Sequence, residues 1–255
     1  MFRPSALSSS IYICSSMSSE ELQHSPMAIN GMKLLLYVEH QGGIPLTQVS
    51  KNFQRKCVEW AAVEFQWPGY EPEKLYDLNK VLNELDFLPL SLLHSAFLDI
   101  RLIRHFKGRA VLTKAGKAML GQHGELQAVL AEWILMTPHR DYVALEAMPL
   151  FWDISHMIGV ISNRLHEWMT VGDLTECLIP IDLIETSGPL GARHHGALLI
   201  GVNLVRPLVW LGLAEERGRD IPAIRIEDRQ VRKTPLFDRL FKTSVPLSVW
   251  SASVH

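Results

Sequence analysis

The chain has 255 residues, and its 25 Lys and Arg against 27 Asp and Glu give a formal net charge of −2. This charge excludes an overall basic field that would draw the protein to nucleic acid or anionic membranes, so a polyanion would have to meet a local patch. With 47% apolar and 20% charged residues, the composition is that of a globular protein and excludes wholesale disorder or a fibrous architecture.

The first 27 residues differ in composition from the rest of the chain. They are rich in Ser and lack a sustained apolar period, so we expect residues 1–27 to form a disordered Ser-rich leader. Met17 and Met27 are alternative starts. The uncharged run from Pro4 to Ser19 is half Ser, which is too polar for a bilayer span, so no membrane partner is expected.

The first half of the chain predicts helices interrupted by short extended pieces. In chain order these are a helix from Ile29 to the Gly42-Gly43 stop, a short strand at 44–47, helices at 49–65, 72–82 and 89–105, a hairpin at 106–113 and a helix capped by Thr113. This order is typical of a winged helix-turn-helix.

The second half predicts the same order. Its elements are a helix at 151–168, a short strand at 169–171, helices at 172–184 and 196–213, a longer hairpin at 214–234 and a final helix capped by Thr234. Pro207 should kink or break the helix at 196–213. Thr113 and Thr234 are 121 residues apart, which suggests an internal repeat, although two unrelated helical stretches can also be overlaid in this way.

We therefore predict an α+β fold, mainly α with short β-hairpins, built from tandem winged helix-turn-helix-like units. The first unit covers residues 28–140, the second covers 141–243, and residues 244–255 form a tail.

Opposite charges are segregated along the sequence. Residues 101–117 carry six Lys and Arg and no acid, residues 217–242 carry eight basic residues against four acidic ones, and residues 125–185 carry ten acidic residues against two basic ones. Both basic segments are predicted hairpins, so they can form an edge that follows phosphates, or they can simply be solvated. The DNA-contact candidates are Lys51, Asn52, Arg55, Arg101, Arg104, Lys107, Arg109 and Lys114.

Two predicted helices, at 89–103 and 196–211, display few of the polar side chains that read base edges, which is evidence against sequence-specific binding. The start of the helix at 49–65 carries better groups for this purpose, among them Lys51, Asn52 and Arg55.

Motifs for enzymatic chemistry are absent: there is no Walker loop, GxGxxG, GxSxG, SxxK or HExxH. We therefore expect no catalytic activity and no cofactor. His194 and His195, in a Gly-flanked stretch, are weak metal-ligand candidates and the centre of an alternative hydrolase or metal-enzyme hypothesis, with Asp182 or Glu185 as a third ligand.

Three cysteines, at positions 14, 57 and 177, form no CxxC pair, and such sparse usage suits a reducing cytoplasm. We expect Cys57, in a helical stretch, to be a buried free thiol.

The segments GGIPLTQVSKNFQRKCVEWAA (42–62) and IRLIRHFKGRAVLTKAGKAMLGQHGEL (100–126) resemble a region of uncharacterised bacterial proteins with a winged-helix-like pattern, some of them carried on plasmids and mobile elements. The resemblance covers about residues 32–135. It implies a bacterial origin and a fold class, and no activity. The second half departs from the pattern, because Phe237 stands where Gly116 would.

The leading hypothesis is a non-enzymatic, cytoplasmic winged-helix protein that binds double-stranded DNA or regulates as an accessory factor. The alternative is a protein–protein interaction module or homodimeric scaffold of a mobile element, whose partners are proteins.

Overall fold

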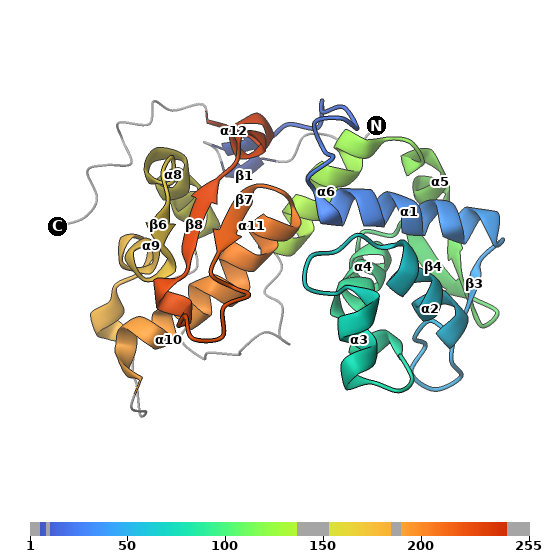
Figure 1. Ribbon diagram of the computed structural model, residues 1–255. Helices are drawn as coiled ribbons and strands as arrows, with labels where there is room; N and C mark the ends of the chain where they lie inside the picture. The colour runs from blue at the N-terminus through green and yellow to red at the C-terminus, as the bar shows by residue number, and fades with distance from the viewer. Residues whose placement is uncertain (1–5, 9–10, 137–152, 185–189, 244–255) are drawn as a thin grey trace. The chain divides into compact units, whose positions relative to one another are not determined.

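A computed structural model describes residues 6–8, 11–136, 153–184 and 190–243. The chain divides into two compact units: an N-terminal unit of residues 16–133, and a C-terminal unit of residues 1–15 with 134–255. Each is α+β, with helices around a small antiparallel sheet (Figure 1). The predicted α+β class, mainly α with short antiparallel strands, is confirmed. The predicted boundary at 140/141 and the tail at 244–255 lie outside the described residues.

The N-terminal unit packs its helices against one three-stranded sheet of order β3-β5-β4. Its elements are α1 (Pro26–His40), β3 (Ile44–Pro45), α2 (Arg55–Glu64), α3 (Pro72–Leu78), the 3-10 turn η1 (Glu84–Asp86), α4 (Leu88–Asp99), β4 (Ile103–Phe106), β5 (Arg109–Leu112), α5 (Lys114–Met119) and α6 (His123–Met136), which runs past the unit boundary.

Helix α1 is central to this unit, and its ends follow from its sequence. The Ser25 hydroxyl accepts a hydrogen bond from the Ala28 N–H, and Pro26 occupies the first turn, where its missing N–H does no harm. At its other end Gly43 has a φ of +102°, and a side chain there would collide with Val111 of β5. This glycine therefore lets the chain turn tightly into β3.

The β4–β5 hairpin closes through a two-residue turn. Lys107 and Gly108 have φ values of +47° and +74°, which correspond to the turn type that matches the twist of a hairpin. The Leu46 N–H donates to the Gly108 carbonyl, so the chain leaving β3 lies beside the hairpin tip. The predicted Lys-Gly tip and the Thr113 cap are confirmed, the latter by a bond from the Gly116 N–H to the Thr113 hydroxyl.

The C-terminal unit has a sheet of order β6-β8-β7 and a second small sheet of order β1-β2-β9. Its elements are β1 (Ala6–Ser8), β2 (Ile11–Ile13), α8 (Ile154–Arg164), β6 (Met169–Thr170), α9 (Val171–Leu178), η2 (Ile181–Leu183), α10 (Gly191–Ile200), η3 (Gly201–Val205), α11 (Arg206–Trp210), β7 (Ala214–Arg217), η4 (Ile226–Asp228), β8 (Gln230–Lys233), α12 (Pro235–Leu240) and β9 (Phe241–Thr243).

The two units share details of connection. The Thr113 N–H donates to the Leu102 carbonyl at 3.0 Å, and the Thr234 N–H donates to the Leu213 carbonyl at 2.9 Å. In both units a short strand pairs with the second strand of the hairpin. One difference concerns the predicted cap at Thr234, whose hydroxyl donates to the Gly212 carbonyl and makes no cap bond.

The leader predicted as disordered is folded over much of its length. Ile11 and Ile13 are buried in β2, which pairs with β9, and Leu22 is buried in the N-terminal unit. The prediction was wrong because the partner strand lies at the far end of the chain, at 241–243, and local composition cannot reveal it.

Helix α2 begins at Arg55, six residues later than predicted. The Thr47 hydroxyl accepts from the Asn52 N–H, the Thr47 N–H donates to the Asn52 carbonyl, and Lys51 has a φ of +59°. These bonds close residues 47–52 into a turn. Lys51 and Asn52 therefore precede the helix on which they were predicted to lie.

Two other helices of the N-terminal unit end earlier than predicted, and the predicted interruption near Pro207 is confirmed. The helix predicted at 89–105 ends at Asp99, because Arg101 adopts a left-handed conformation and the chain then enters β4. The helix predicted at 72–82 ends at Leu78. The helix around Pro207 is interrupted as expected, since a π-helical turn, η3, precedes this residue, which cannot donate to the helix ladder.

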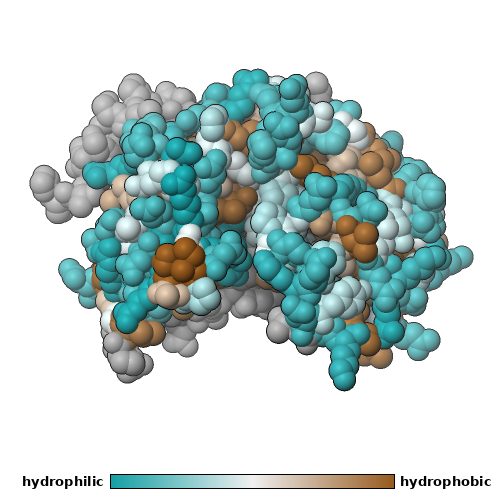
Figure 2. Space-filling view, viewed as in Figure 1, coloured by the Kyte–Doolittle hydropathy of each residue, from teal (hydrophilic) through white to brown (hydrophobic). Residues whose placement is uncertain are grey.

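The apolar side chains are mainly inside each unit. In the N-terminal unit Phe53, Phe87 and Phe97 are fully buried. The face in Figure 2 is largely hydrophilic, with small separate apolar patches. Extended exposed apolar surface, the usual mark of a large protein interface, is not seen on this face.

Candidate nucleic-acid interface

The β4–β5 hairpin separates a polar outer face from an apolar inner one. Ile103 and Leu112 point to the core, while Arg104 and Phe106 alternate with them on the outer face. The Phe106 ring is 47% exposed, and the charged groups of Arg104 and Lys107 lie 5.0 and 5.4 Å from its centroid. An exposed aromatic ring therefore lies between two cations at the hairpin tip.

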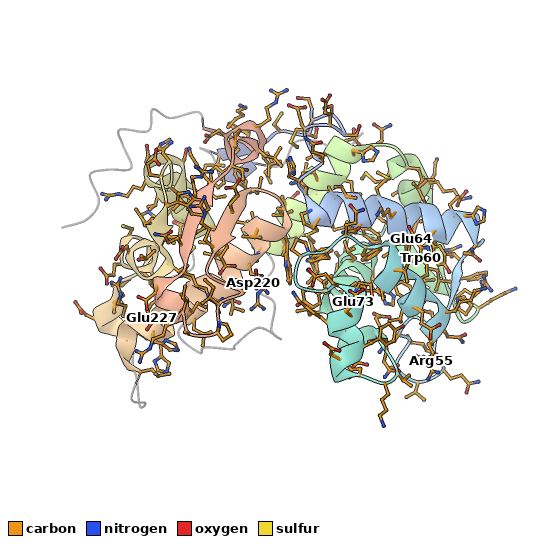
Figure 3. The ribbon with its side chains drawn as sticks, viewed as in Figure 1. Arg55, Trp60, Glu64, Glu73, Asp220 and Glu227 are labelled. Carbon is orange, nitrogen blue, oxygen red and sulfur yellow. The ribbon has the colours of Figure 1, made fainter. Side chains whose placement is uncertain are left out.

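Several predicted contacts gather on or next to this hairpin. Lys51 belongs to the 47–52 turn beside the tip, Arg55 opens α2 directly after that turn (Figure 3), and Lys114 follows the Thr113 cap. The structure thus brings segments some 60 residues apart together. We call Lys51, Arg55, Arg101, Arg104, Lys107 and Lys114 the basic hairpin region.

The basic hairpin region is uncompensated by acids. Within the described residues none of its six side chains forms an ion pair. Lys51 donates instead to the Gln48 carbonyl. Six cations that form no ion pair among the described residues add local positive charge to a chain whose net charge is −2.

Arg109, another predicted contact, makes hydrogen bonds within the N-terminal unit. Its Nη2 donates to the Gln41 carbonyl at 3.1 Å and to the Gly43 carbonyl. These bonds attach the hairpin to the end of α1. Arg109 therefore positions the hairpin, and Asn52, whose backbone closes the 47–52 turn, also has a structural role.

Three basic residues have left-handed backbone conformations: Lys51, Arg101 and Lys107, with φ of +59°, +57° and +47°. Among the described residues no other side-chain-bearing residue has a positive φ. This conformation costs a non-glycine residue about 1–2 kcal/mol. Such strain concentrates where a side chain must be displayed for function.

Arg101 lets this strain be measured. It follows α4 where the Leu102 N–H donates to the Phe97 carbonyl, a helix ending that usually carries Gly at this position. In the C-terminal unit Gly212 occupies the equivalent position, with a φ of +71°. Arg101→Gly should therefore stabilise the protein by about 0.5–1 kcal/mol in urea unfolding, after allowing for the greater freedom of an unfolded Gly.

The control for Arg101 is the reverse change in the other unit. Gly212→Arg should lower stability by about 1 kcal/mol or more. Loss of stability in Arg101→Gly would show that the arginine side chain contributes more to folding than its backbone costs.

Behind the hairpin lies a row of ionisable groups that sequence reasoning missed. Glu84 of η1 is 3% exposed and receives the Phe53 N–H and, at 2.7 Å, the Nδ1–H of His94. The Nε2 of His94 lies 3.1 Å from the Nε2 of His105 on β4. The Phe53 ring stacks on His94 at 3.9 Å. These residues connect the core to the hairpin.

Helix α4 exposes few side chains that could contact base edges. Most of its residues are buried or half-buried, and only Ser95 and Asp99 of this helix are exposed. Asp99 also accepts a hydrogen bond from the Trp133 indole. This agrees with the expectation that the helix offers few groups to base edges.

The cations of the β7–β8 hairpin, in the C-terminal unit, have aromatic or acidic partners within that unit. The guanidinium groups of Arg217 and Arg232 lie over the Trp168 ring, at 3.7 and 4.8 Å from its centroid, and Arg232 also pairs with Glu215 at 3.0 Å. Glu216 lies 3.5 Å from Arg229 and 3.9 Å from Arg219. These cations are committed to internal partners.

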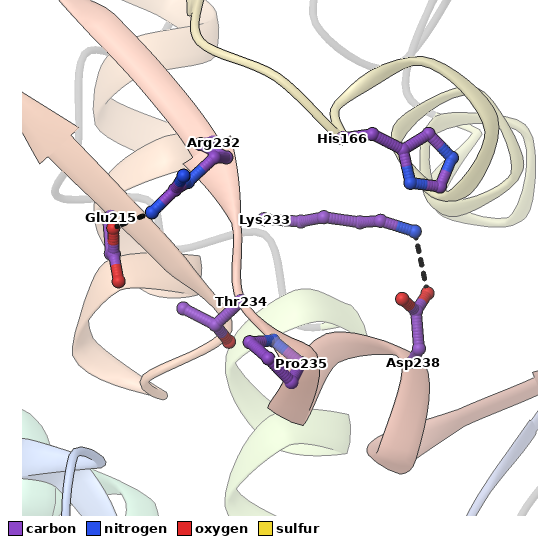
Figure 4. Close-up of a pocket in the computed structure, with 7 residues that line it drawn as sticks. All are labelled: His166, Glu215, Arg232, Lys233, Thr234, Pro235 and Asp238. Atoms are coloured by element: carbon purple, nitrogen blue, oxygen red, sulfur yellow. Dashed lines mark hydrogen bonds and ion pairs between the residues drawn. The ribbon is translucent and has the colours of Figure 1, made fainter.

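An open pocket of about 400 Å³ adjoins this hairpin, lined by His166, Glu215, Arg232, Lys233, Thr234, Pro235 and Asp238 (Figure 4). Its two cations point to opposite sides, and each meets a carboxylate: Arg232 meets Glu215, and Lys233 meets Asp238 at 2.7 Å. Lys233 is buried and also donates to the Ser162 carbonyl near the end of α8. These bonds join β8 to two helices.

The predicted metal candidates point to separate partners. His195 Nδ1 donates to the Gly191 carbonyl one turn earlier in α10, while His194 Nδ1 lies 2.7 Å from Glu227. Burial raises the pKa of Glu227, but its own backbone N–H and then His194 reverse this, so the net pKa is lowered. Among the described residues no three potential ligands gather into a metal site, and Glu185 lies outside those residues.

Known sequences resemble the unit that carries the basic hairpin region. Residues 23–125 match the Y4jL N-terminal domain family. The uncharacterized protein y4jL of Sinorhizobium fredii (strain NBRC 101917 / NGR234) is 42% identical over 96 residues, which are 38% of this chain and 43% of that protein. The chain thus spans under half the length of the curated relative that it matches. No solved structure matches it.

The resemblance predicted for residues 32–135 is confirmed at the level of an uncharacterised bacterial family. The names of this family and of the similar protein state no activity. No helix of the described residues is long and apolar enough to cross a membrane.

Proposed function

We propose that the N-terminal unit is a winged-helix-like module that binds double-stranded DNA through the basic hairpin region. The observation that carries this proposal is the difference between the two hairpins. The β4–β5 hairpin displays cations without acidic partners around an exposed Phe106, whereas the cations of the β7–β8 hairpin pair with acids or cover Trp168. Of these two hairpins, only β4–β5 has cations that can pair with phosphates without first leaving an acidic or aromatic partner.

The mode of binding is contact with the DNA backbone. Helix α4 is too buried to enter a groove, while the hairpin and the 47–52 turn expose long, flexible cations. Cations on such segments contact phosphates irrespective of sequence. Phe106 adds an apolar surface that can lie against sugars or a base step in the minor groove.

In this proposal the protein is a non-enzymatic accessory or regulatory factor of the bacterial cytoplasm, and the C-terminal unit is a second winged-helix-like module. The shared element order of the two units supports the second statement. The free thiols of Cys14, Cys57 and Cys177 suit a reducing compartment.

Charge reversal at the hairpin tip tests the proposal. In the full chain, Arg104→Glu with Lys107→Glu should weaken binding to a fluorescent random duplex at least about tenfold at low salt, because two phosphate contacts become repulsive. Fluorescence anisotropy measures the change in affinity, and circular dichroism checks that the fold is retained.

The matched control is Lys74→Glu with Lys80→Glu, on the exposed surface around α3, which alters net charge by the same amount. It should leave affinity within about twofold of the wild type, since unspecific charge effects away from the contact are screened. Equal weakening in both variants would mean that DNA responds to net charge and not to this hairpin. Unchanged binding in the hairpin variant would favour a protein-interaction module.

A further inference from the structure

A row of three ionisable side chains links the core of the N-terminal unit to the hairpin. Glu84 and His94 are 3% and 5% exposed, while His105, on β4 immediately before the exposed Phe106, reaches the surface. Their contacts are short, with 2.7 Å between Glu84 Oε1 and His94 Nδ1, and 3.1 Å between the two histidine Nε2 atoms. The basic hairpin region therefore contains a titratable group tied to the interior.

Hydrogen-bond chemistry determines how many protons this row can hold. A carboxylate only accepts, so the Nδ1 of His94 must carry hydrogen. The two Nε2 atoms that face each other then share a single hydrogen between them. When that hydrogen is on His105, one added proton at His105 Nδ1 makes this ring an imidazolium and leaves the Nε2–Nε2 hydrogen bond in place.

We propose that His105 is a proton-dependent phosphate contact: it is neutral against His94 in the free protein, and it takes up one proton and pairs with a phosphate as an imidazolium when the hairpin meets DNA. This inference rests on the DNA-binding function proposed above and adds a residue that the charge pattern at neutral pH does not reveal. Its neighbours on β4 and at the tip, Arg104 and Lys107, are in place to hold the same phosphate backbone.

The groups that face His105 favour its neutral form in the free protein. Burial lowers its pKa most, His94 of α4 and Lys51 of the 47–52 turn lower it further, and Glu84 of η1 opposes them. Burial and then Glu84 raise the pKa of Cys57 on α2, so this thiol stays uncharged beside the row. These groups therefore favour the neutral form of His105 in the free protein.

The direction of the pH dependence follows from linkage. A phosphate next to His105 favours the charged imidazole and so raises its pKa in the complex. Binding then takes up a proton, and affinity rises as pH falls from above the complex pKa towards the lowered pKa of the free protein. Below that value both states are protonated and the rise stops. One proton allows at most about a tenfold gain per pH unit.

The test compares the full chain with two variants of His105 and one control. Wild-type affinity for a random duplex should rise about three- to tenfold between roughly pH 7.5 and 5.5, in proportion to the proton taken up. His105→Gln should remove most of this rise. His105→Arg, a permanent cation, should bind at the higher pH about as tightly as the wild type does at the lower one, without a pH dependence of its own at this position.

His24→Gln, at an exposed histidine of the same unit, should keep the wild-type pH profile. A proton-uptake measurement by calorimetry in two buffers provides a second readout that loss of packing alone would not change. If the wild type binds DNA with steep salt dependence but His105→Gln has the same pH profile, the inference is overturned and the proposed function stands. If the wild type binds no DNA at any pH, the proposed function is overturned together with it.

Discussion

Replacing Gly116 with alanine is expected to destabilise the protein by about 3–5 kcal/mol, because the new methyl group has no room. An ideal Cβ at this position lies 2.0 Å from the Leu102 carbonyl oxygen. That oxygen also accepts the Thr113 N–H at the base of the hairpin, so it cannot move without breaking a backbone hydrogen bond. Urea unfolding followed by tryptophan fluorescence measures the loss.

Gly31→Ala is the matched control in α1. Its Cβ would lie 3.4–3.5 Å from three leucine side chains, which is close to ordinary contact, and alanine is the better helix former. We expect a change within about 1 kcal/mol. A loss in Gly116→Ala no larger than in Gly31→Ala would contradict the close approach of α5 to the hairpin base.

The second large effect is expected at Glu84. Glu84→Ala leaves the Phe53 N–H and the His94 Nδ1–H buried without their acceptor, and we expect a loss of about 3–5 kcal/mol in unfolding free energy. Glu84→Gln, which retains one carbonyl acceptor, should be less harmful. The measurement is again urea unfolding of the full chain.

Glu39→Ala is the surface counterpart. Glu39 pairs with Lys117 at 3.3 Å, and the two side chains are 43% and 61% exposed, so its loss should change stability by at most about 1 kcal/mol. If Glu84→Ala lowered the unfolding free energy no more than Glu39→Ala does, the Glu84–His94–His105 row would not stabilise the hairpin. The pH dependence proposed at His105 would then lack its structural basis.

The tip and second strand of the β4–β5 hairpin were predictable because their signals are local, whereas most of β4 (Ile103–Phe106) was predicted to belong to the helix at 89–105. The Lys107-Gly108 tip, the alternating residues of β5 and the Thr113 cap are adjacent in the sequence, and the structure contains all three. The start of α2 was not predictable, since it depends on how the Thr47 side chain and the left-handed Lys51 close a turn against β3. Helical periodicity alone extends the helix too far back.

Long-range partners account for what the sequence could not reveal. Glu84, His94 and His105 belong to three different elements, and no spacing rule joins them. The Ser-rich composition of the leader suggested disorder. The β2–β9 pairing that orders it joins opposite ends of the chain, so local composition could not reveal it. The charge pattern did locate the basic hairpin region, but only the structure separates its unpaired cations from Arg109, which is used internally.

The most direct test of the DNA-binding account is the salt dependence of duplex binding by the full chain. If about four phosphates are neutralised, the slope of log K against log salt should be near −3.6, and affinity should fall about 100-fold between roughly 50 and 200 mM salt. The Arg104→Glu, Lys107→Glu variant should flatten that slope by about 2. Absence of binding at the lower salt, or binding that hardly responds to salt, would contradict the account.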